Sequence, residues 1–198
     1  MEVKIINATE NPIDTISLAA GTSYNKDNSS LKRVQSCVKL GHWSVIEFAN
    51  IYFKVEGISR ACANQLVRHR LASYVQESER YVKIDVSNDD WYVVPPSIED
   101  SNCSHIYREH HKYAAINYKN MLDSGIKPED ARFLLPQSAK TKISVQMNCR
   151  EFFNFLNLRL DSHAQWEIRE LARSMKDAVA SYNEQWEQII EMYDSFNK

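Results

Sequence analysis

The chain has 198 residues, of which 43% are hydrophobic and 25% are charged, an ordinary balance for a globular protein. Lysine and arginine total 24 against 26 acidic residues, and the resulting net charge of −2 excludes a global basic field that would hold nucleic acid or an anionic membrane. Only four glycines occur, which excludes the Rossmann fingerprint and the Walker A loop because both need several closely spaced glycines. Any bound phosphate would therefore be held mainly by side chains.

The first half of the chain predicts a mixture of strands and helices. Gly41 is placed to end a helix in the left-handed conformation, and Ser59 to cap the start of another. The expected elements are a strand over residues 1–7, a partly helical segment over 9–24, a helix over 31–40, a buried strand over 45–55 and a helix over 59–71.

The second half of the chain is mainly helical in its pattern. Pro128 opens one helix and Pro136 closes it. The other expected elements are a loop or irregular strand over residues 73–83, strands over 91–94 and 141–147, and helices over 105–122, 149–158 and 164–193. Asn148 is expected to cap the helix that follows it, and Asp161 or Ser162 the next one. Together the elements predict one α+β domain over residues 1–198, with a mainly antiparallel sheet packed against several helices and a long C-terminal helix.

The cysteines are far apart in the sequence and form neither a CxxC pair nor a zinc-ribbon spacing. They are Cys37, Cys62, Cys103 and Cys149. Nothing resembles a signal peptide at the start, and no run of about 18 apolar residues is present. We therefore expect free thiols, no bound metal ion, no membrane partner and a cytoplasmic location.

The segment Arg68-His69-Arg70 opens the strongest local cluster of cations, which Ser78 and Arg80 complete. A guanidinium is always charged and binds phosphate through two hydrogen bonds, so this cluster is suited to replace the missing glycine loop. Charge clustering alone slightly favours the other interpretation, in which the cations stabilise a helix end and pair with the two glutamates within residues 77–79.

Arg159 and Arg132 each stand in an apolar stretch. The stretch around Arg159 runs from Phe152 to Leu160, and a charge among so many apolar neighbours needs an anionic partner. Arg132 adjoins three apolar residues, and its position fits a ligand contact and an ion pair with Glu129 about equally.

Three separated segments form a specific pattern. The first is RHR, seven residues, Ser, one residue and Arg, which residues 68–80 fit fully. The others are GHWSVIEF at 41–48 and FLNLRLDSHAQWEIRELA at 155–172. In order and spacing the three resemble the flavin-dependent thymidylate synthase family, from about Val3 to about Met175. The chain departs from the family pattern at Phe48, where the family usually has His, and at Val75-Gln76, where it often has Asn-Glu.

The resemblance implies an enzyme that converts dUMP to dTMP. The carbon would come from 5,10-methylenetetrahydrofolate, and NADPH would supply electrons through bound FAD. The resemblance also implies a homotetramer whose active sites are shared between chains. No enzyme nucleophile is then required, which agrees with a sequence in which no cysteine has a local histidine partner.

By resemblance, the site residues fall into two overlapping sets. Those that would contact FAD are Ser44, Arg68, His69, Arg70, Gln76, Asn148, Cys149, Arg150 and Asn154. Those that would bind dUMP are Gln65, Arg68, Gln76, Glu77, Ser78, Glu79, Arg80, Arg132 and Arg159. His42 and Tyr81 would lie towards the folate. Arg159 is the expected catalytic residue, because a guanidinium near N3 and O4 of uracil stabilises the N3 anion and makes C5 nucleophilic.

Two other functions remain open at this point. One is a flavoprotein of the same fold that keeps only reductase or oxidase activity. The departures from the family pattern at Phe48 and Gln76 suggest this alternative. The other is a nucleic-acid-binding module that uses the arginine cluster with Tyr74 and Tyr81, against which the net charge argues. Flavin absorbance in the purified protein would exclude the nucleic-acid module.

Overall fold

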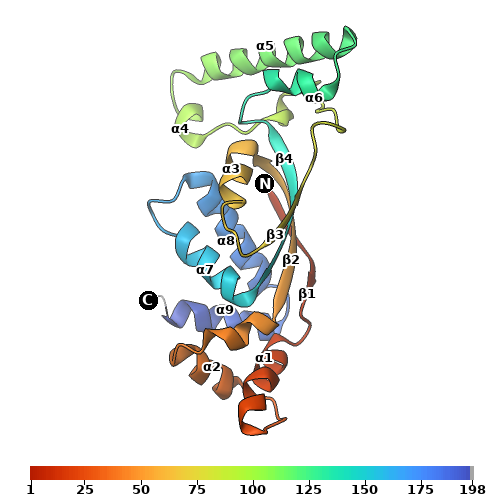
Figure 1. Ribbon diagram of the computed structural model, residues 1–198. Helices are drawn as coiled ribbons and strands as arrows, with labels where there is room; N and C mark the ends of the chain where they lie inside the picture. Colours follow the sequence, from red (N-terminus) through yellow and green to blue (C-terminus); the bar gives the residue numbers. More distant parts are fainter. Residues whose placement is uncertain (197–198) are drawn as a thin grey trace. The chain divides into compact units, whose positions relative to one another are not determined.

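A computed structural model describes residues 1–196 of the chain. Within these residues four strands form one sheet in the order β1-β2-β4-β3, with helices beside it (Figure 1). The strands are β1 (Glu2–Ala8), β2 (Asn50–Ser59), β3 (Ser73–Gln76) and β4 (Lys140–Asn148). The predicted α+β class with an antiparallel sheet is confirmed.

Helices account for much of the remaining described chain. The α-helices are α1 (Pro12–Gly21), α2 (Leu31–Lys39), α3 (Arg60–Leu66), α4 (Pro96–Glu99), α5 (Ser104–Asp123), α6 (Pro128–Ala131), α7 (Cys149–Arg159), α8 (Trp166–Ala180) and α9 (Glu184–Phe196). Short 3-10 helices are η1 (Thr22–Tyr24), η2 (Trp43–Phe48), η3 (Asp89–Trp91) and η4 (Arg132–Leu134). None of the helices within residues 1–196 has the length and apolar content needed to cross a membrane.

The strand predicted over residues 45–55 begins only at Asn50, because the residues before it form η2. Trp43 and Ile46 are three positions apart, a spacing that places both on one side of a 3-10 helix. Ile46 is fully buried, and the Trp43 ring meets Phe153 edge to face. Packing of η2 against α1 and α7 therefore overrides the strand pattern of the sequence.

The long helix predicted over residues 164–193 is divided into α8 and α9. The Asn183 side chain accepts a hydrogen bond from the Trp186 N–H at 3.0 Å, so it caps the start of α9. The start of α8 is also later than predicted, because Gln165 caps it rather than Asp161 or Ser162. Two side-chain caps, Gln165 and Asn183, therefore decide where α8 and α9 begin more strongly than the apolar period does.

Other predicted boundaries have mixed outcomes. Asn148 caps α7 by accepting from the Glu151 N–H at 2.9 Å, as predicted. The Ser59 hydroxyl accepts from the Cys62 N–H at 3.0 Å and caps α3, as predicted. The strand predicted over 91–94 is wrong, because within it only an isolated bridge from Tyr92 to Ala139 forms.

The chain divides into two compact units. Unit 1 contains residues 1–55, residues 66–75 and the described residues from 144 onward, and unit 2 contains residues 56–65 and 76–143. The chain passes between the units within β2, α3, β3 and β4. One domain over residues 1–198 stays a prediction.

Unit 1 has a core built largely from its C-terminal helices. Phe152, Phe153 and Phe155 of α7 are fully buried, and α8 packs against β1, α7 and α9. On α9, Trp186 is fully buried, and its indole N–H donates to the Thr9 carbonyl at 2.9 Å. Burial of each large apolar side chain stabilises the fold by about 1.5–3 kcal/mol, so α7 is held firmly in place. Helix α7 also carries several predicted site residues.

Unit 2 has a smaller core in which His111 of α5 is buried. Its ring stacks on Tyr92 with centroids 4.0 Å apart. The ring Nδ1 lies 2.6 Å from the Tyr107 carbonyl, and Nε2 lies 2.6 Å from the Ser138 hydroxyl. A carbonyl only accepts, so Nδ1 carries the proton of the neutral ring and Nε2 accepts from the hydroxyl.

We expect the protein to lose stability as the pH falls below about 6.5, because the folded state resists protonation of His111. Burial lowers the pKa of His111, so the unfolded chain takes up the proton first. The free energy of unfolding should then fall with pH by at most about 1.4 kcal/mol per pH unit for this group. Urea melts between about pH 7 and pH 5 should show a weaker pH dependence in His111→Gln.

The matched control is His105→Gln, because His105 lies exposed on the same helix. Both variants keep the buried His69, whose pKa burial also lowers, so its contribution cancels in the comparison. Equal slopes in wild type, His111→Gln and His105→Gln would contradict the prediction.

Candidate functional site

The predicted site residues divide between the two units largely by ligand. Most predicted cofactor contacts lie in unit 1, namely Ser44, Arg68, His69, Arg70, Asn148, Cys149, Arg150 and Asn154, whereas Gln76 lies in unit 2. Most predicted substrate contacts lie in unit 2, namely Gln65, Gln76, Glu77, Ser78, Glu79, Arg80 and Arg132, whereas Arg68 and Arg159 lie in unit 1. Each unit therefore brings together one group of cations.

In unit 1, Tyr74 fixes the segment that carries Arg68 and Arg70. Its hydroxyl donates to the His69 carbonyl at 2.7 Å and lies 3.1 Å from the carbonyl of Leu66, where α3 ends. Burial raises the pKa of Tyr74 to about 12, so the hydroxyl keeps its proton. The two arginines are exposed and form no ion pair within the described part of unit 1. They are therefore available to an anionic ligand.

Tyr74→Phe should lower the free energy of unfolding by about 1–2 kcal/mol, because it leaves a buried carbonyl without its donor. Urea denaturation followed by circular dichroism measures the loss. Tyr113→Phe is the control, since Tyr113 is exposed on α5. If the Tyr74 variant is as stable as the control, the hydroxyl does not hold this segment.

His69 is buried, although it stands between two exposed arginines. Its Nε2 lies 3.3 Å from Glu151 Oε2, and its ring meets Phe155 edge to face. Glu151 is also buried and accepts a hydrogen bond from Asn154 Nδ2 at 3.3 Å. Burial lowers the pKa of His69, and the negative charge of the nearby Glu151 carboxylate opposes that effect. The imidazole thus anchors the arginine segment to α7.

Two open cavities of unit 1 lie at the start of α7. The larger, of about 510 Å³, is lined in part by Arg70, Asn148 and Arg150. The smaller, of about 420 Å³, is lined in part by Arg150 and Asn154. Arg150 lines both and pairs with Glu47 at 2.6 Å. Guanidinium groups beside amide side chains suit a ligand that is both anionic and rich in hydrogen-bonding groups.

Arg159 ends α7 and is half-buried. Its charge lowers the pKa of both His69 and Tyr74, so the guanidinium lies near the segment that holds the two exposed arginines. The structure thus brings Arg159 to the same part of unit 1 as Arg68 and Arg70, although about ninety positions separate them in the sequence.

Cys149 does not present its thiol to a ligand in unit 1. The residue is fully buried, its N–H donates to the Ala49 carbonyl at 2.8 Å, and burial raises the pKa of the thiol. The expected cofactor contact at this position therefore does not come from the side chain. Ser44 is exposed on η2, which packs against α7.

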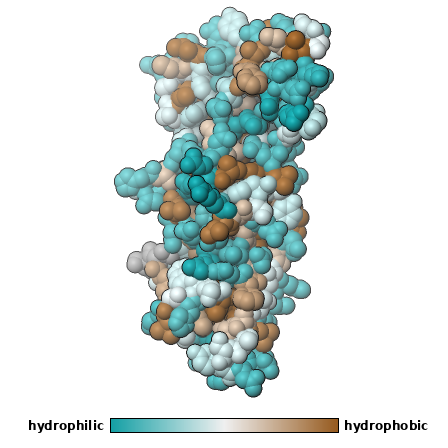
Figure 2. Space-filling view, viewed as in Figure 1, coloured by the Kyte–Doolittle hydropathy of each residue, from teal (hydrophilic) through white to brown (hydrophobic). Residues whose placement is uncertain are grey.

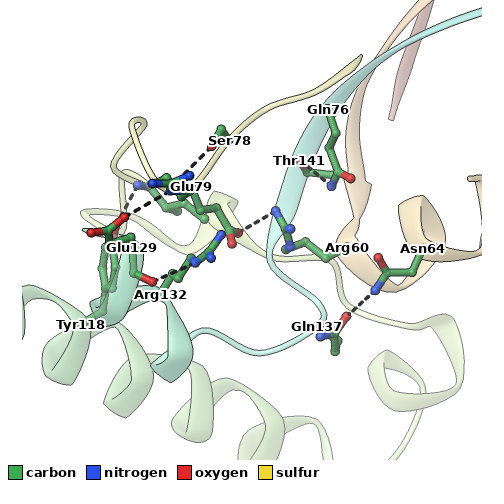
Figure 3. A network of polar contacts seen from close by, with 12 residues as sticks. Arg60, Asn64, Gln76, Ser78, Glu79, Tyr118, Glu129, Arg132, Gln137 and Thr141 are labelled. Atoms are coloured by element: carbon green, nitrogen blue, oxygen red, sulfur yellow. Dashed lines mark hydrogen bonds and ion pairs between the residues drawn. The ribbon is translucent and has the colours of Figure 1, made fainter. Parts of the chain in front are cut away.

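In unit 2, three arginines and two glutamates form what we call the arginine cluster: Arg60, Arg80, Arg132, Glu79 and Glu129. Figure 3 shows Arg60, Arg132, Glu79 and Glu129 of this cluster. Arg80 Nε lies 3.2 Å from Glu129 Oε2, and Arg132 Nε donates to the Glu129 carbonyl at 3.0 Å. Arg60 Nη1 lies 3.0 Å from Glu79 Oε1. The partner of Arg80 is therefore not Glu77 or Glu79, and Arg132 meets the backbone of Glu129 rather than its carboxylate.

The other predicted residues of unit 2 shape the chain beside the arginine cluster. Gln76 Nε2 donates to the Thr141 hydroxyl at 3.3 Å, and the Glu77 N–H donates to the Lys142 carbonyl at 2.9 Å. The Ser78 hydroxyl accepts from the Arg80 N–H at 3.3 Å. These bonds fix the end of β3 and the turn that follows. Gln65 is half-buried near the end of α3.

Three polar residues of these sites were not predicted from the sequence: Arg60, Glu47 and Glu151. Arg60 stands between an apolar strand and an apolar helix, the same signal that singled out Arg159. The two glutamates carry no such signal, because single carboxylates are common at helix surfaces. The fold alone brings Glu47 to Arg150, which lies 103 positions later.

No group of three or more His, Cys, Asp or Glu residues that could hold a metal ion occurs in the described part of the chain. All four cysteines are free thiols.

Comparison with known proteins identifies a family and several relatives. The profile of the family described as "Thymidylate synthase complementing protein" matches residues 4–187. A flavin-dependent thymidylate synthase from Pyrococcus furiosus is 40% identical over 195 residues, which cover 91% of this chain and 79% of that protein. One from Pyrococcus horikoshii is 42% identical over 200 residues, which cover 93% and 81%. The crystal structure of a flavin-dependent thymidylate synthase from Helicobacter pylori, complexed with FAD and dUMP, matches with a TM-score of 0.76 at 26% identity and covers 90% of this chain and 93% of its own.

Proposed function

The chain belongs to the flavin-dependent thymidylate synthase family, and we propose that its two groups of cations serve the reductive methylation of dUMP to dTMP, one holding FAD and the other the nucleotide. In this reaction 5,10-methylenetetrahydrofolate is the carbon donor and NADPH the reductant. The observation that carries the proposal is that unit 1 holds exposed arginines and unit 2 holds the arginine cluster.

The residues of unit 1 suit FAD. Its diphosphate requires cations and hydrogen-bond donors, and the chain has no glycine loop to supply them. Arg70 and Arg150 line the larger cavity with Asn148, and Asn154 lines the neighbouring one. Arg68 is exposed in the same segment as Arg70. When bound, FAD supplies the hydride chemistry, and the residues of the chain bind and orient it.

The residues of unit 2 suit a nucleoside monophosphate. Arg80 contacts the Glu129 carboxylate and Arg132 contacts its backbone carbonyl, and the Ser78 hydroxyl accepts from the Arg80 N–H in the adjoining turn. A guanidinium binds a phosphate through two parallel hydrogen bonds, which fixes the direction of the ester. Ser78 would then donate to the phosphate rather than attack it.

Arg159 is the residue we assign to catalysis on the pyrimidine. Its charge stabilises negative charge as N3 of uracil ionises, which directs electron density to C5. Its half-buried position at the end of α7 strengthens this effect, because a charge acts more strongly where water is partly excluded.

A homotetramer with shared sites is part of the same proposal. Large apolar side chains stand exposed beside predicted site residues, notably Leu71 and Val75 in unit 1 and Tyr81 and Phe133 in unit 2. On the face shown in Figure 2, hydrophobic residues likewise form separate patches among hydrophilic ones. Exposed apolar patches beside a site are typical of surfaces that another subunit covers. A cytoplasmic location stays a prediction from the free thiols.

The test is an assay of purified protein with dUMP, methylenetetrahydrofolate and NADPH. We expect flavin absorbance in the purified protein, dTMP as product, and a particle of four chain masses by light scattering. Flavin that cycles with NADPH while no dTMP forms would replace the synthase with a reductase. A stable, fully active monomer would exclude shared sites.

A further inference from the structure

Arg60 is a largely buried cation that the roles described above do not use. It is the first residue of α3, directly after the Ser59 cap, and its side chain is 24% exposed. Its Nη1 pairs with Glu79 at 3.0 Å, and the Glu79 side chain is only 9% exposed. A charge buried to this degree is costly unless its hydrogen-bonding groups are satisfied, so its remaining donors require an explanation.

Arg60 faces a cavity that a second arginine also lines. This cavity has a volume of about 280 Å³, and its lining includes Arg60, Glu79 and Arg132. Arg132 uses Nε for the Glu129 carbonyl, which leaves its terminal nitrogens to the cavity. Arg60 Nη1 lies in ion-pair range of Glu79, yet among the described residues this buried nitrogen has no hydrogen-bond partner, so the guanidinium keeps donor capacity for a ligand. Figure 3 shows both guanidinium groups with Glu79 between them.

The charges of the cavity favour an anion. Two guanidinium groups and one carboxylate sum to one positive charge, and the guanidinium donors outnumber the acceptors. Glu79 offsets part of the positive charge, but it also fixes the direction of the Arg60 fork. The flexible Arg60 side chain is thereby held in one position before a ligand arrives, which lowers the entropy cost of binding.

We propose that Arg60, oriented by Glu79, is a further substrate-binding residue that joins Arg132 in holding the phosphate of the nucleotide. In this arrangement Arg60 contacts the phosphate, and Glu79 is a positioning residue that acts through Arg60. The inference rests on the proposed function, since it assigns a new residue to the nucleotide site of unit 2.

The experiment compares dUMP with deoxyuridine, which lacks the phosphate, in FAD-loaded wild type and in Arg60→Gln. Equilibrium binding is measured by calorimetry for both ligands. We expect Arg60→Gln to weaken dUMP binding by about 10- to 100-fold, the range for loss of a charge-assisted contact, and to leave deoxyuridine binding unchanged within about twofold. Inorganic phosphate should compete with dUMP less effectively in the variant than in wild type.

Arg60→Lys provides a second test if the glutamine variant does not fold. Lysine keeps the positive charge that pairs with Glu79 and loses only the planar guanidinium group. We expect it to weaken dUMP selectively by about tenfold. Glu79→Gln should weaken dUMP by a smaller factor, since Arg60 keeps its charge but loses its orientation. The control is Arg108→Gln, which removes an exposed ion pair with Glu99 in the same unit.

Three results would overturn the proposal. An equal loss of dUMP and deoxyuridine would make Arg60 a structural residue only. A loss of FAD affinity with dUMP binding retained would assign its charge to the cofactor phosphates. Unchanged dUMP affinity in both Arg60 variants would remove it from the site. If wild type itself does not prefer dUMP to deoxyuridine, the proposed function fails together with the inference.

Discussion

Arg159→Ala should reduce dTMP formation by about a hundredfold or more while FAD remains bound, the scale expected when one donor to a developing anion is removed. Arg159 lies at the end of α7 near His69 and Tyr74, and not among the residues that line the two cavities at the start of α7. Flavin reduction by NADPH should therefore proceed at the wild-type rate. Stopped-flow flavin reduction and a dTMP assay on one preparation separate the two steps.

Arg159→Lys sharpens this test, because it keeps the charge and loses the planar pair of donors. We expect dTMP formation to be impaired in the lysine variant as well. Arg173→Ala is the matched control, since Arg173 is exposed on the neighbouring helix α8. Wild-type dTMP formation in Arg159→Ala would show that this guanidinium has no part in the chemistry.

Arg70→Ala should release FAD or weaken its binding by about 10- to 100-fold, because a charge-assisted contact to phosphate is lost. Arg70 lines the larger cavity of unit 1, is exposed, and forms no ion pair within the described part of that unit. Its removal should therefore cost little stability. The ratio of flavin to protein absorbance after gel filtration, followed by FAD titration, measures the effect.

The control for flavin binding is again Arg173→Ala, with the same change of charge outside both groups of cations. A full complement of FAD in Arg70→Ala, with unchanged affinity, would show that the larger cavity does not hold the cofactor through this residue. Loss of bound FAD can itself lower thermal stability, so stability is compared between the FAD-free forms of wild type and Arg70→Ala. We expect these two forms to be equally stable.

Regular periodicity made several elements predictable to within a residue or two. The helix predicted over 105–122 is α5, and the strand predicted over 141–147 is β4, because each presents one apolar pattern without interruption. Failures occurred where contacts distant in sequence decide the backbone. Trp43 and Ile46 are drawn into a 3-10 helix by α1 and α7, and Asn183 divides the C-terminal helix by capping α9.

The candidate site was predictable in composition but not in its internal contacts. The RHR signature identified Arg68, Arg70 and Arg80, and apolar surroundings singled out Arg132 and Arg159, whereas Arg60 was missed. No local pattern indicates that His69 turns inward to Glu151, or that Glu79 pairs with Arg60. These pairs form between residues on separate elements that meet only in the folded chain. They therefore could not be predicted from local patterns in the sequence.

The passage of the chain between the two units has a consequence for how the protein can evolve. Each crossing lies inside a strand or helix, at β2, α3, β3 and β4. Neither unit is encoded by one continuous segment of the gene. Exchange of a whole unit with a related gene would therefore join a strand or helix from two different sequences at each crossing. The cations proposed to bind the cofactor and those proposed to bind the nucleotide are thus encoded on interleaved segments of one gene and are inherited together. New substrate preferences in such a chain must arise by point substitution within unit 2 rather than by exchange of modules.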